Sequence, residues 1–291
     1  MKDLRVTTGG VLAMLALLAL LAGPATGWAQ DSIDSRCTNP SDTACVDWEA
    51  GVAIAIGSGA PMANAANQAV RNQSALRAAK LDAYRNILEL VRGLNVSSSS
   101  SMKDLMIEND TVRTEVEGRL HGVRQVGTPK YFSDGSIQVK IEARLTEVVP
   151  ENLYAESGPP RQLEAPGMAP SGAGVDAGRV YTGLIIDARG TGVLPAISPK
   201  VLDPEGREIY GSAYVSREFV VSQGMAGYVK SVDAARQNDR VKGNPAVIKA
   251  VEARGANKAD LVIAQQDADA LRALSQTQTF LRESRVMIVL D

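Results

Sequence analysis

The stretch Ile137-Gln-Val-Lys-Ile-Glu-Ala-Arg-Leu145 decides the fold of the first half of the chain. Its apolar side chains fall on every second residue, and the residues between them are polar or charged. A period of two is typical of a β-strand with one buried face and one wet face. The turn sequence Ser133-Asp134-Gly135 precedes this strand. We therefore expect a hairpin whose partner strand is Gly118–Lys130.

A long helix is expected before the hairpin. Between Asn64 and Val91 the sequence contains neither glycine nor proline and is rich in Ala, Arg, Leu and Gln. Such a composition favours a helix, and Gly93 stands where a left-handed residue would end it. The apolar residues that share one face of this helix are Leu76, Ala79, Ala83, Ile87, Leu90 and Val91.

Shorter elements flank the long helix. Val52–Ile56 is expected as a strand, followed by a Gly57–Pro61 loop. The serine run Ser97–Ser101 is expected as a solvated loop, which could become ordered at a subunit contact, and its last residue begins a capping signal for a short helix. Residues 46–149 are thus predicted to form an α+β domain, with the long helix packed on a small antiparallel sheet.

The outer face of the long helix has two interpretations. Its apolar stripe can pack on its own sheet alone. Alternatively, Leu81, Tyr84 and Leu88 form a second apolar face that is available to another copy of the chain. A helix that is apolar over more than one stripe must bury more than one side, so a homo-oligomer is expected in the second case.

A proline- and glycine-rich segment, residues 150–179, separates this domain from a second one, residues 180–291. The apolar residues of the segment show no period, which is typical of a linker. The second domain is predicted to hold a mixed α/β sheet because its last elements follow a β-α-β order. Its expected strands and hairpin are Val180–Ile186, Lys200–Tyr210, Val215–Val221, Leu261–Ala264 and Val286–Leu290, and its expected helices are Ser231–Asn238, Pro245–Arg254 and Asp267–Leu274.

The start of the chain has the pattern of a secretory signal peptide over residues 1–29. Lys2 and Arg5 supply the positive charge, and twelve apolar residues follow from Val11 to Ala22. Twelve residues of helix span about 18 Å, short of the roughly 30 Å of a bilayer core, so a retained anchor is the weaker interpretation. Pro24 stands where a lipoprotein would carry its acylated cysteine. We expect a periplasmic product that is not lipidated.

The chain has two cysteines, Cys37 and Cys45, in a polar stretch of an N-terminal arm, residues 30–45. Export to an oxidising compartment favours a local disulfide between them. They do not form the C-x-x-C pair of a redox centre.

A resemblance to a known family rests on three segments of the first domain. They are DAYRNILELVRGLNV at 82–96, GRLHGV at 118–123 and YFSDGSIQVKI at 131–141. Over residues 46–149 the chain resembles the flagellar assembly protein FlgP, the N-terminal domain of FlgT and related small outer-membrane lipoproteins. The resemblance implies a helix on an antiparallel sheet that builds ring- or disk-like assemblies around the flagellar rod. Its implied partners are envelope or flagellar ring proteins, with peripheral contact to the outer membrane and no catalytic residues.

Composition excludes several classes of function. Lys and Arg total 31 against 33 acidic residues, so no basic surplus exists for binding a nucleic-acid backbone. The chain has a single histidine, His121, which excludes catalytic sets and metal sites that need two imidazoles.

Val52–Ile56, Gly57–Gly59 and the following helix form the sharpest candidate for chemistry, because a strand, a glycine loop and a helix N-terminus can cradle a dinucleotide phosphate. Met62 replaces the third glycine of that fingerprint, and no Gly-Lys-Ser/Thr follows. An ordinary turn from strand to helix is favoured, and no cofactor is expected.

Three polar positions remain as weaker candidates. His121 could be a general base, but it is interpreted as a strand residue bonded to the backbone. Asp267 and Asp269 could bind a cation, although a helix N-terminus already favours acidic residues, so no metal is expected. Asp187 and Arg189 follow a buried strand and are expected to form a salt bridge that fixes a loop.

The function favoured by these patterns is that of a non-enzymatic structural or assembly protein of the cell envelope. Its most specific form is association with the flagellum or the outer membrane. The alternative is a periplasmic module that binds a small ligand or glycan at a cleft of the second domain. That cleft would be lined by Tyr181, Tyr210, Tyr214 and Tyr228. The third interpretation is a hydrolase or transferase that uses acids such as Asp187 and Asp203.

Overall fold

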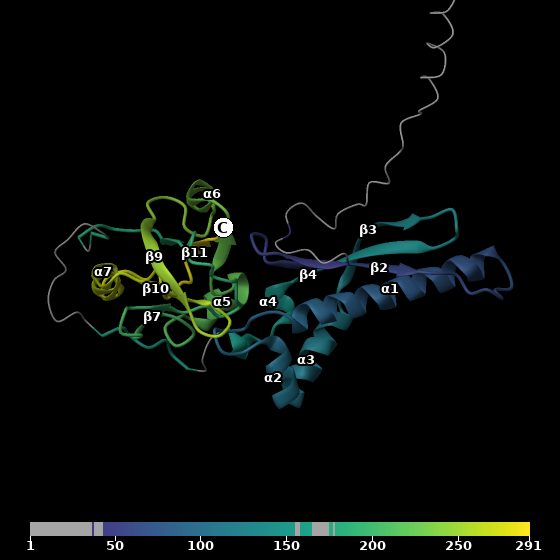
Figure 1. Ribbon diagram of the computed structural model, residues 1–291, viewed down its shortest axis with the longest axis horizontal. Helices are drawn as coiled ribbons and strands as arrows, with labels where there is room; N and C mark the ends of the chain where they lie inside the picture. Colours follow the sequence, from purple (N-terminus) through teal and green to yellow (C-terminus); the bar gives the residue numbers. More distant parts are fainter. Residues whose placement is uncertain (1–36, 38–42, 155–157, 165–174, 177) are drawn as a thin grey trace, which may run out of the picture. The chain divides into compact units, whose positions relative to one another are not determined.

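The alternating strand lies inside a four-stranded antiparallel sheet in the computed structural model, which describes residues 37, 43–154, 158–164, 175–176 and 178–291 (Figure 1). The strand is β4, Ile137–Arg144, and it pairs with β2, Val52–Gly59, and with β3, Arg124–Tyr131. A fourth strand, β1, Ala44–Asp47, pairs with the other side of β2. Ile137, Val139, Ile141 and Ala143 are buried on one face of β4, which confirms the predicted period.

One long helix, α1, Gln68–Arg92, packs along β2 and β4 of this sheet (Figure 1). The Asn67 side chain caps its first turn by accepting a hydrogen bond from the Val70 N–H. The buried residues of α1 are Ala75, Ala79, Ala83, Ile87 and Val91. Small side chains on this face let the helix backbone approach the sheet closely.

The close approach explains the glycines of β2. A Cβ atom on Gly57 would lie 2.1 Å from the Ala83 nitrogen, and one on Gly59 would lie 2.2 Å from the Ala75 carbonyl oxygen. The loop predicted for Gly57–Pro61 was therefore placed too early, because Gly57–Gly59 continue the strand β2 where the helix leaves no room for a side chain. Gly93 also differs from the expectation, since its φ of −76° is right-handed.

Two short helices follow α1. Ser101 and Asp104 form the predicted capping box at the start of α2, Met102–Glu108, and Asn109 caps α3, Asp110–His121. The expected partner strand of the hairpin was placed too early, because residues 118–121 belong to α3. A buried helical stripe of Val112, Val116 and Leu120 holds that last turn against the core. After β4 the chain continues through α4, Leu145–Val148, and a 3-10 turn, η1, Glu151–Leu153.

The second domain contains a mixed sheet with the strand order β7-β6-β10-β9-β5-β11-β8. The strands β9, β5, β11 and β8 run parallel to one another, and the remaining three include antiparallel pairs. The strands are β5 Leu184–Asp187, β6 Val201–Leu202, β7 Glu208–Tyr210, β8 Gly227–Val229, β9 Ala246–Arg254, β10 Asp260–Ile263 and β11 Val286–Val289. The helices are α5 Arg217–Gln223, α6 Val232–Gln237 and α7 Gln265–Ser275. The predicted fold class is confirmed: α+β, with a second mixed sheet.

Two predicted elements of the second domain have the wrong type. The expected strand Val215–Val221 is the helix α5, and the expected helix Pro245–Arg254 is the strand β9. In β9 the buried residues Ala246, Ile248 and Ala250 alternate with exposed ones, which is a period of two. A mixture of Ala, Lys and Glu concealed that period, because these residues also favour helices.

The serine run is not a solvated loop. Ser98 accepts a hydrogen bond from the Asn257 N–H at 2.9 Å through its carbonyl oxygen, and its hydroxyl donates to the Asp260 carboxylate at 2.5 Å. Upstream, Asn95 accepts a hydrogen bond from the Ile197 N–H at 2.9 Å. These contacts tie the loop to the second sheet within the same chain.

The described parts of the expected linker also contact the second domain. The Arg161 N–H donates to the Ala213 carbonyl at 2.8 Å, and Leu163 is buried. Among the described residues, no helix is both long enough and apolar enough to cross a bilayer. The predicted signal peptide and most of the N-terminal arm lie outside the described residues.

Candidate functional site

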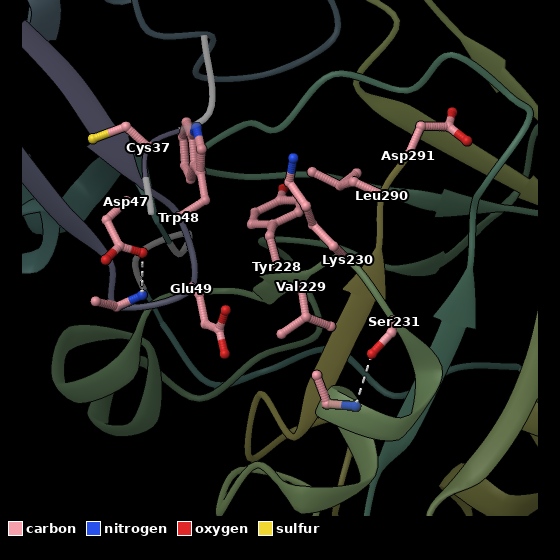
Figure 2. A pocket seen from close by; sticks show the side chains of 12 residues that line it. Cys37, Asp47, Trp48, Glu49, Tyr228, Val229, Lys230, Ser231, Leu290 and Asp291 are labelled. Atoms are coloured by element: carbon pink, nitrogen blue, oxygen red, sulfur yellow. Dashed lines mark hydrogen bonds between the residues drawn. The ribbon is translucent and has the colours of Figure 1, made fainter. Parts of the chain in front are cut away.

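The carboxyl ends of three parallel strands meet at one edge of the second sheet. Asp187 ends β5, Lys230 follows β8, and Asp291 lies two residues after the end of β11. Ligands of sheets with parallel strands commonly bind beyond this edge. A cavity of about 590 Å³ lies there, and we call it the strand-end cavity (Figure 2). Its opposite side is formed by the turn between β1 and β2, which includes Trp48 and Glu49.

An aromatic pair forms one wall of the strand-end cavity. The rings of Trp48 and Tyr228 meet edge to face, with their centres 5.3 Å apart (Figure 2). The Tyr228 hydroxyl donates to the Ala196 carbonyl at 2.8 Å and accepts from the Ala196 N–H at 3.0 Å. Burial raises the pKa of Tyr228 above its ordinary range. Tyr228 is therefore a fixed, neutral support for the Trp48 ring.

Charges of both signs line the same cavity. Glu49 and Lys230 make no hydrogen bond or ion pair with any other described residue. Asp47 is buried and accepts a hydrogen bond from the Ala50 N–H at 3.0 Å, and Asp291 accepts one from the Gly190 N–H at 2.9 Å. Two of the cavity's charged groups, one acidic and one basic, are thus available to a ligand.

Asp187 and Arg189 form the expected salt bridge. Arg189 donates two hydrogen bonds to the Asp187 carboxylate, at 2.8 and 2.7 Å. These bonds lower the pKa of Asp187 and raise that of Arg189. The pair fixes the loop before Gly190, which has a positive φ of 80°. Because the Asp187 carboxylate is paired with the Arg189 guanidinium, it is poorly placed to act on a substrate.

Asp203 lies in a separate, buried ion pair. Its side chain is inaccessible to solvent and accepts hydrogen bonds from Arg272 at 2.5 Å and from Arg207 at 2.6 Å. Burial alone would raise the pKa of Asp203, but the hydrogen bonds from the two arginines outweigh it and hold the pKa below its ordinary value. The geometry gives this carboxylate a structural role.

His121 lies at the end of α3 and not in a strand, which corrects the expectation for its location. Its Nδ1 lies 2.6 Å from the Glu117 carbonyl oxygen, and its ring stacks on Tyr84 at 6.3 Å. Backbone bonding of the ring agrees with the structural interpretation of this residue.

Asp267 and Asp269 have different hydrogen-bond partners. Burial raises the pKa of Asp267, whereas Asp269 accepts hydrogen bonds from Gln265 and Arg272. Within the part of the chain that the structure describes, no three His, Cys, Asp or Glu side chains are grouped so that they could hold a metal ion.

The four tyrosines of the alternative binding cleft do not share a cavity. The Tyr210 hydroxyl donates to the Met225 carbonyl within the core. Tyr214 borders a smaller cavity of about 240 Å³, and Tyr228 supports the strand-end cavity. Tyr181 lines neither of them.

The second apolar face of α1 is smaller than its sequence suggests. Leu81 is 64% exposed, whereas Tyr84 and Leu88 are partly buried against the core of their own domain. The Tyr84 hydroxyl donates to the Val123 carbonyl at 3.1 Å. Of the three residues, Leu81 is the one that is largely available to a neighbour.

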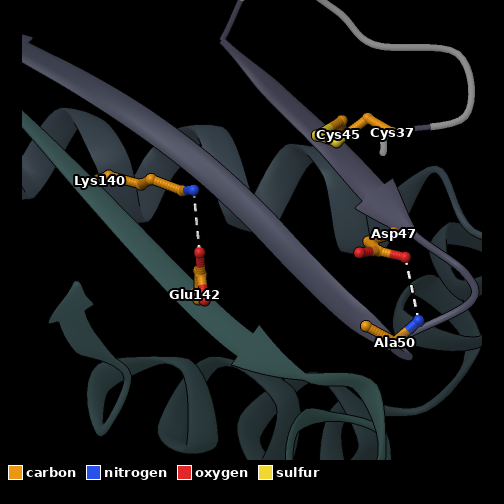
Figure 3. The surroundings of a disulfide bond; sticks show 6 residues. All are labelled: Cys37, Cys45, Asp47, Ala50, Lys140 and Glu142. Carbon is orange, nitrogen blue, oxygen red and sulfur yellow. Dashed lines mark hydrogen bonds and ion pairs between the residues drawn. A yellow bond between two sulfur atoms is a disulfide. The ribbon is translucent and has the colours of Figure 1, made fainter. Parts of the chain in front are cut away.

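Cys37 and Cys45 are joined by a disulfide, with a Cα–Cα distance of 5.7 Å (Figure 3). Cys45 lies in β1 and is buried beside Ile54 of β2. The bond attaches the N-terminal arm to the sheet and closes a short loop, which contributes about 2–3 kcal/mol by chain entropy.

The comparison with known families concerns the second domain. Residues 183–291 are similar to a family described as the second domain of Treponema pallidum Tp0624. The match begins immediately before β5 and includes every strand of the mixed sheet. No curated protein matches the chain. Fold and site together define a two-domain α+β protein with a cavity at the ends of its parallel strands.

Sequence reasoning missed Trp48, Glu49 and Lys230. The turn after β1 carries no motif, and β8 has only three residues, so it shows no period. One signal was available in the sequence. The chain has only two tryptophans, and one of them, Trp48, lies between the acidic residues Asp47 and Glu49.

Proposed function

We propose that this protein is a non-enzymatic assembly protein of the cell envelope, exported to the periplasm and acting through protein–protein contacts. The export signal predicted for residues 1–29 and the resemblance of residues 46–149 to flagellar envelope modules support this role. The flagellar form is its most specific version, with ring proteins as partners and peripheral contact to the outer membrane.

The observation that carries the proposal is an exposed apolar group at one end of the first domain, which we call the tip patch. It consists of Met62, Val70, Tyr131 and Phe132, which are 61, 41, 64 and 48% exposed. The β3–β4 turn and the β2–α1 connection lie at the same end of the domain (Figure 1). The Met62 N–H donates a hydrogen bond to the Ser74 hydroxyl, and Ser74 lies one helical turn after Val70 in α1. Tyr131 of β3 pairs with Ile137 of β4, and Ile137 pairs on its other side with Gly59 of β2.

Exposed Met, Tyr and Phe side chains are enriched at protein interfaces. The sheet edge itself is a poor docking site, because β3 carries Pro129, Lys130 and a register shift, which are features that prevent strand addition. The proposed contact is therefore between side chains, and its occupant is a second copy of this chain, in keeping with the ring-like assemblies that the resemblance implies.

Replacing Tyr131 and Phe132 together by serine is expected to weaken self-association by at least about tenfold, because the two largest side chains of the patch are lost. Light scattering over a concentration series measures the effect. The matched control is Val251→Ser, which removes an equally exposed apolar side chain from β9 of the second sheet. A wild-type protein that stays monomeric at high concentration would contradict the proposal.

A further inference from the structure

We propose that the strand-end cavity binds a small zwitterion, namely an amino acid or short peptide with a free amine and a free carboxylate. This inference does not depend on the assembly role, because the tip patch and the cavity share no residues. Its volume of about 590 Å³ lies within the range of small-molecule sites.

The charges of the cavity favour a ligand that carries both signs. The Glu49 carboxylate is suited to an amine, and the Lys230 ammonium is suited to a carboxylate. Both groups line the cavity, they come from different domains, and they form no ion pair with each other or with another described residue. A ligand with opposite charges at its two ends would satisfy both groups at once.

Ligands with a single charge fit less well. An anion such as a phosphate would face the Glu49 and Asp291 carboxylates, which repel it. A simple cation would leave Lys230 unpaired and would be repelled by it. The mixture of charges thus selects against both classes.

The remaining lining suits a ligand with an apolar side chain. The Trp48 ring lines the cavity beside Tyr228, and its indole N–H has no partner among the described residues. Val229 and Leu290 add aliphatic surface to the same cavity. An aromatic wall with one free donor can hold an apolar side chain and bond to a ligand oxygen.

The test is calorimetric titration of the purified full chain with the dipeptides Ala-Leu and Ala-Phe, each also as its N-acetyl and its C-amide derivative. We expect at least one free dipeptide to bind with a Kd below about 1 mM and at least tenfold more tightly than either of its blocked forms. Glu49→Gln is expected to abolish the preference for the free dipeptide over its N-acetyl form. Lys230→Met is expected to abolish the preference for the free dipeptide over its C-amide form.

The matched controls are Glu108→Gln and Lys103→Met, which change exposed charges of α2 far from the cavity in sequence. They are expected to leave binding unchanged. Three results would overturn the inference. They are no binding at a dipeptide concentration about 10 times the expected Kd, equal binding of the free and the blocked dipeptides, or the same loss of preference in the control variants as in Glu49→Gln and Lys230→Met. Self-association is measured separately, so failure here is distinguishable from failure of the assembly proposal.

Discussion

Replacing Gly57 by alanine is expected to destabilise the protein by at least about 3 kcal/mol, the upper part of the range for overpacked sites. The new Cβ would lie 2.1 Å from the Ala83 nitrogen and 2.2 Å from the Ala79 carbonyl oxygen. Both atoms belong to the backbone of α1, so a rotamer change cannot relieve the clash. The helix must move away from β2, and the buried alanine face of α1 then loses its contacts. Thermal unfolding followed by circular dichroism should show a drop of roughly 10 °C.

Gly118→Ala is the matched control for this prediction. Gly118 lies within α3, and nothing lies within 4 Å of the Cβ it would gain. Alanine is a better helix former than glycine by about 0.5–1 kcal/mol, so this variant should be slightly more stable than the wild type. A Gly57→Ala protein as stable as the wild type would show that α1 does not lie this close to β2.

Asp203→Asn is expected to cost about 3 kcal/mol, because it leaves the Arg272 guanidinium buried without its closest counter-charge. Arg272 is 7% exposed, and its second partner, Asp269, is only partly buried. Denaturant unfolding at neutral pH measures the cost. The control is Arg207→Met, which removes the other partner of the same carboxylate. Arg207 has a side chain that is 62% exposed, so its loss should cost at most about 1 kcal/mol.

The same carboxylate predicts a pH dependence. The pKa of Asp203 is lowered in the folded protein, so its stabilising contribution is present above its unfolded pKa of about 3.9 and is lost as the pH falls through the folded value. Stability of the wild type should therefore decline below about pH 4 more steeply than that of Asp203→Asn. Parallel declines of the two proteins would contradict the buried ion pair.

The elements predicted correctly from sequence are those whose signal is local. The period of β4, the capping box at Ser101 and the Ser133–Gly135 turn each depend on neighbouring residues alone. The Gly57–Gly59 segment of β2 was misplaced because its role depends on a distant part of the chain. Position 57 requires glycine because the backbone of α1 packs against it. In the sequence, a glycine that permits close packing cannot be distinguished from a glycine that forms a loop.

The candidate site shows the same limit. The salt bridge of Asp187 with Arg189 was predictable because the two residues are neighbours in sequence after a buried strand. The strand-end cavity combines residues about 180 positions apart, such as Trp48 and Tyr228. These two residues are in contact because the β1–β2 turn packs beside β8. The periodicity of the sequence does not predict that packing.

The central claim is that the protein acts in the envelope by contact through its tip patch. Site-specific photo-cross-linking in living cells tests it most directly, with the cross-linking residue placed at Phe132 or, as a control, at Val251. We expect the Phe132 probe to produce, in the periplasmic fraction, a product that contains a second copy of this chain, and the Val251 probe to produce none. A chain found in the cytosol with its leader intact, or equal products from both probes, would contradict the claim.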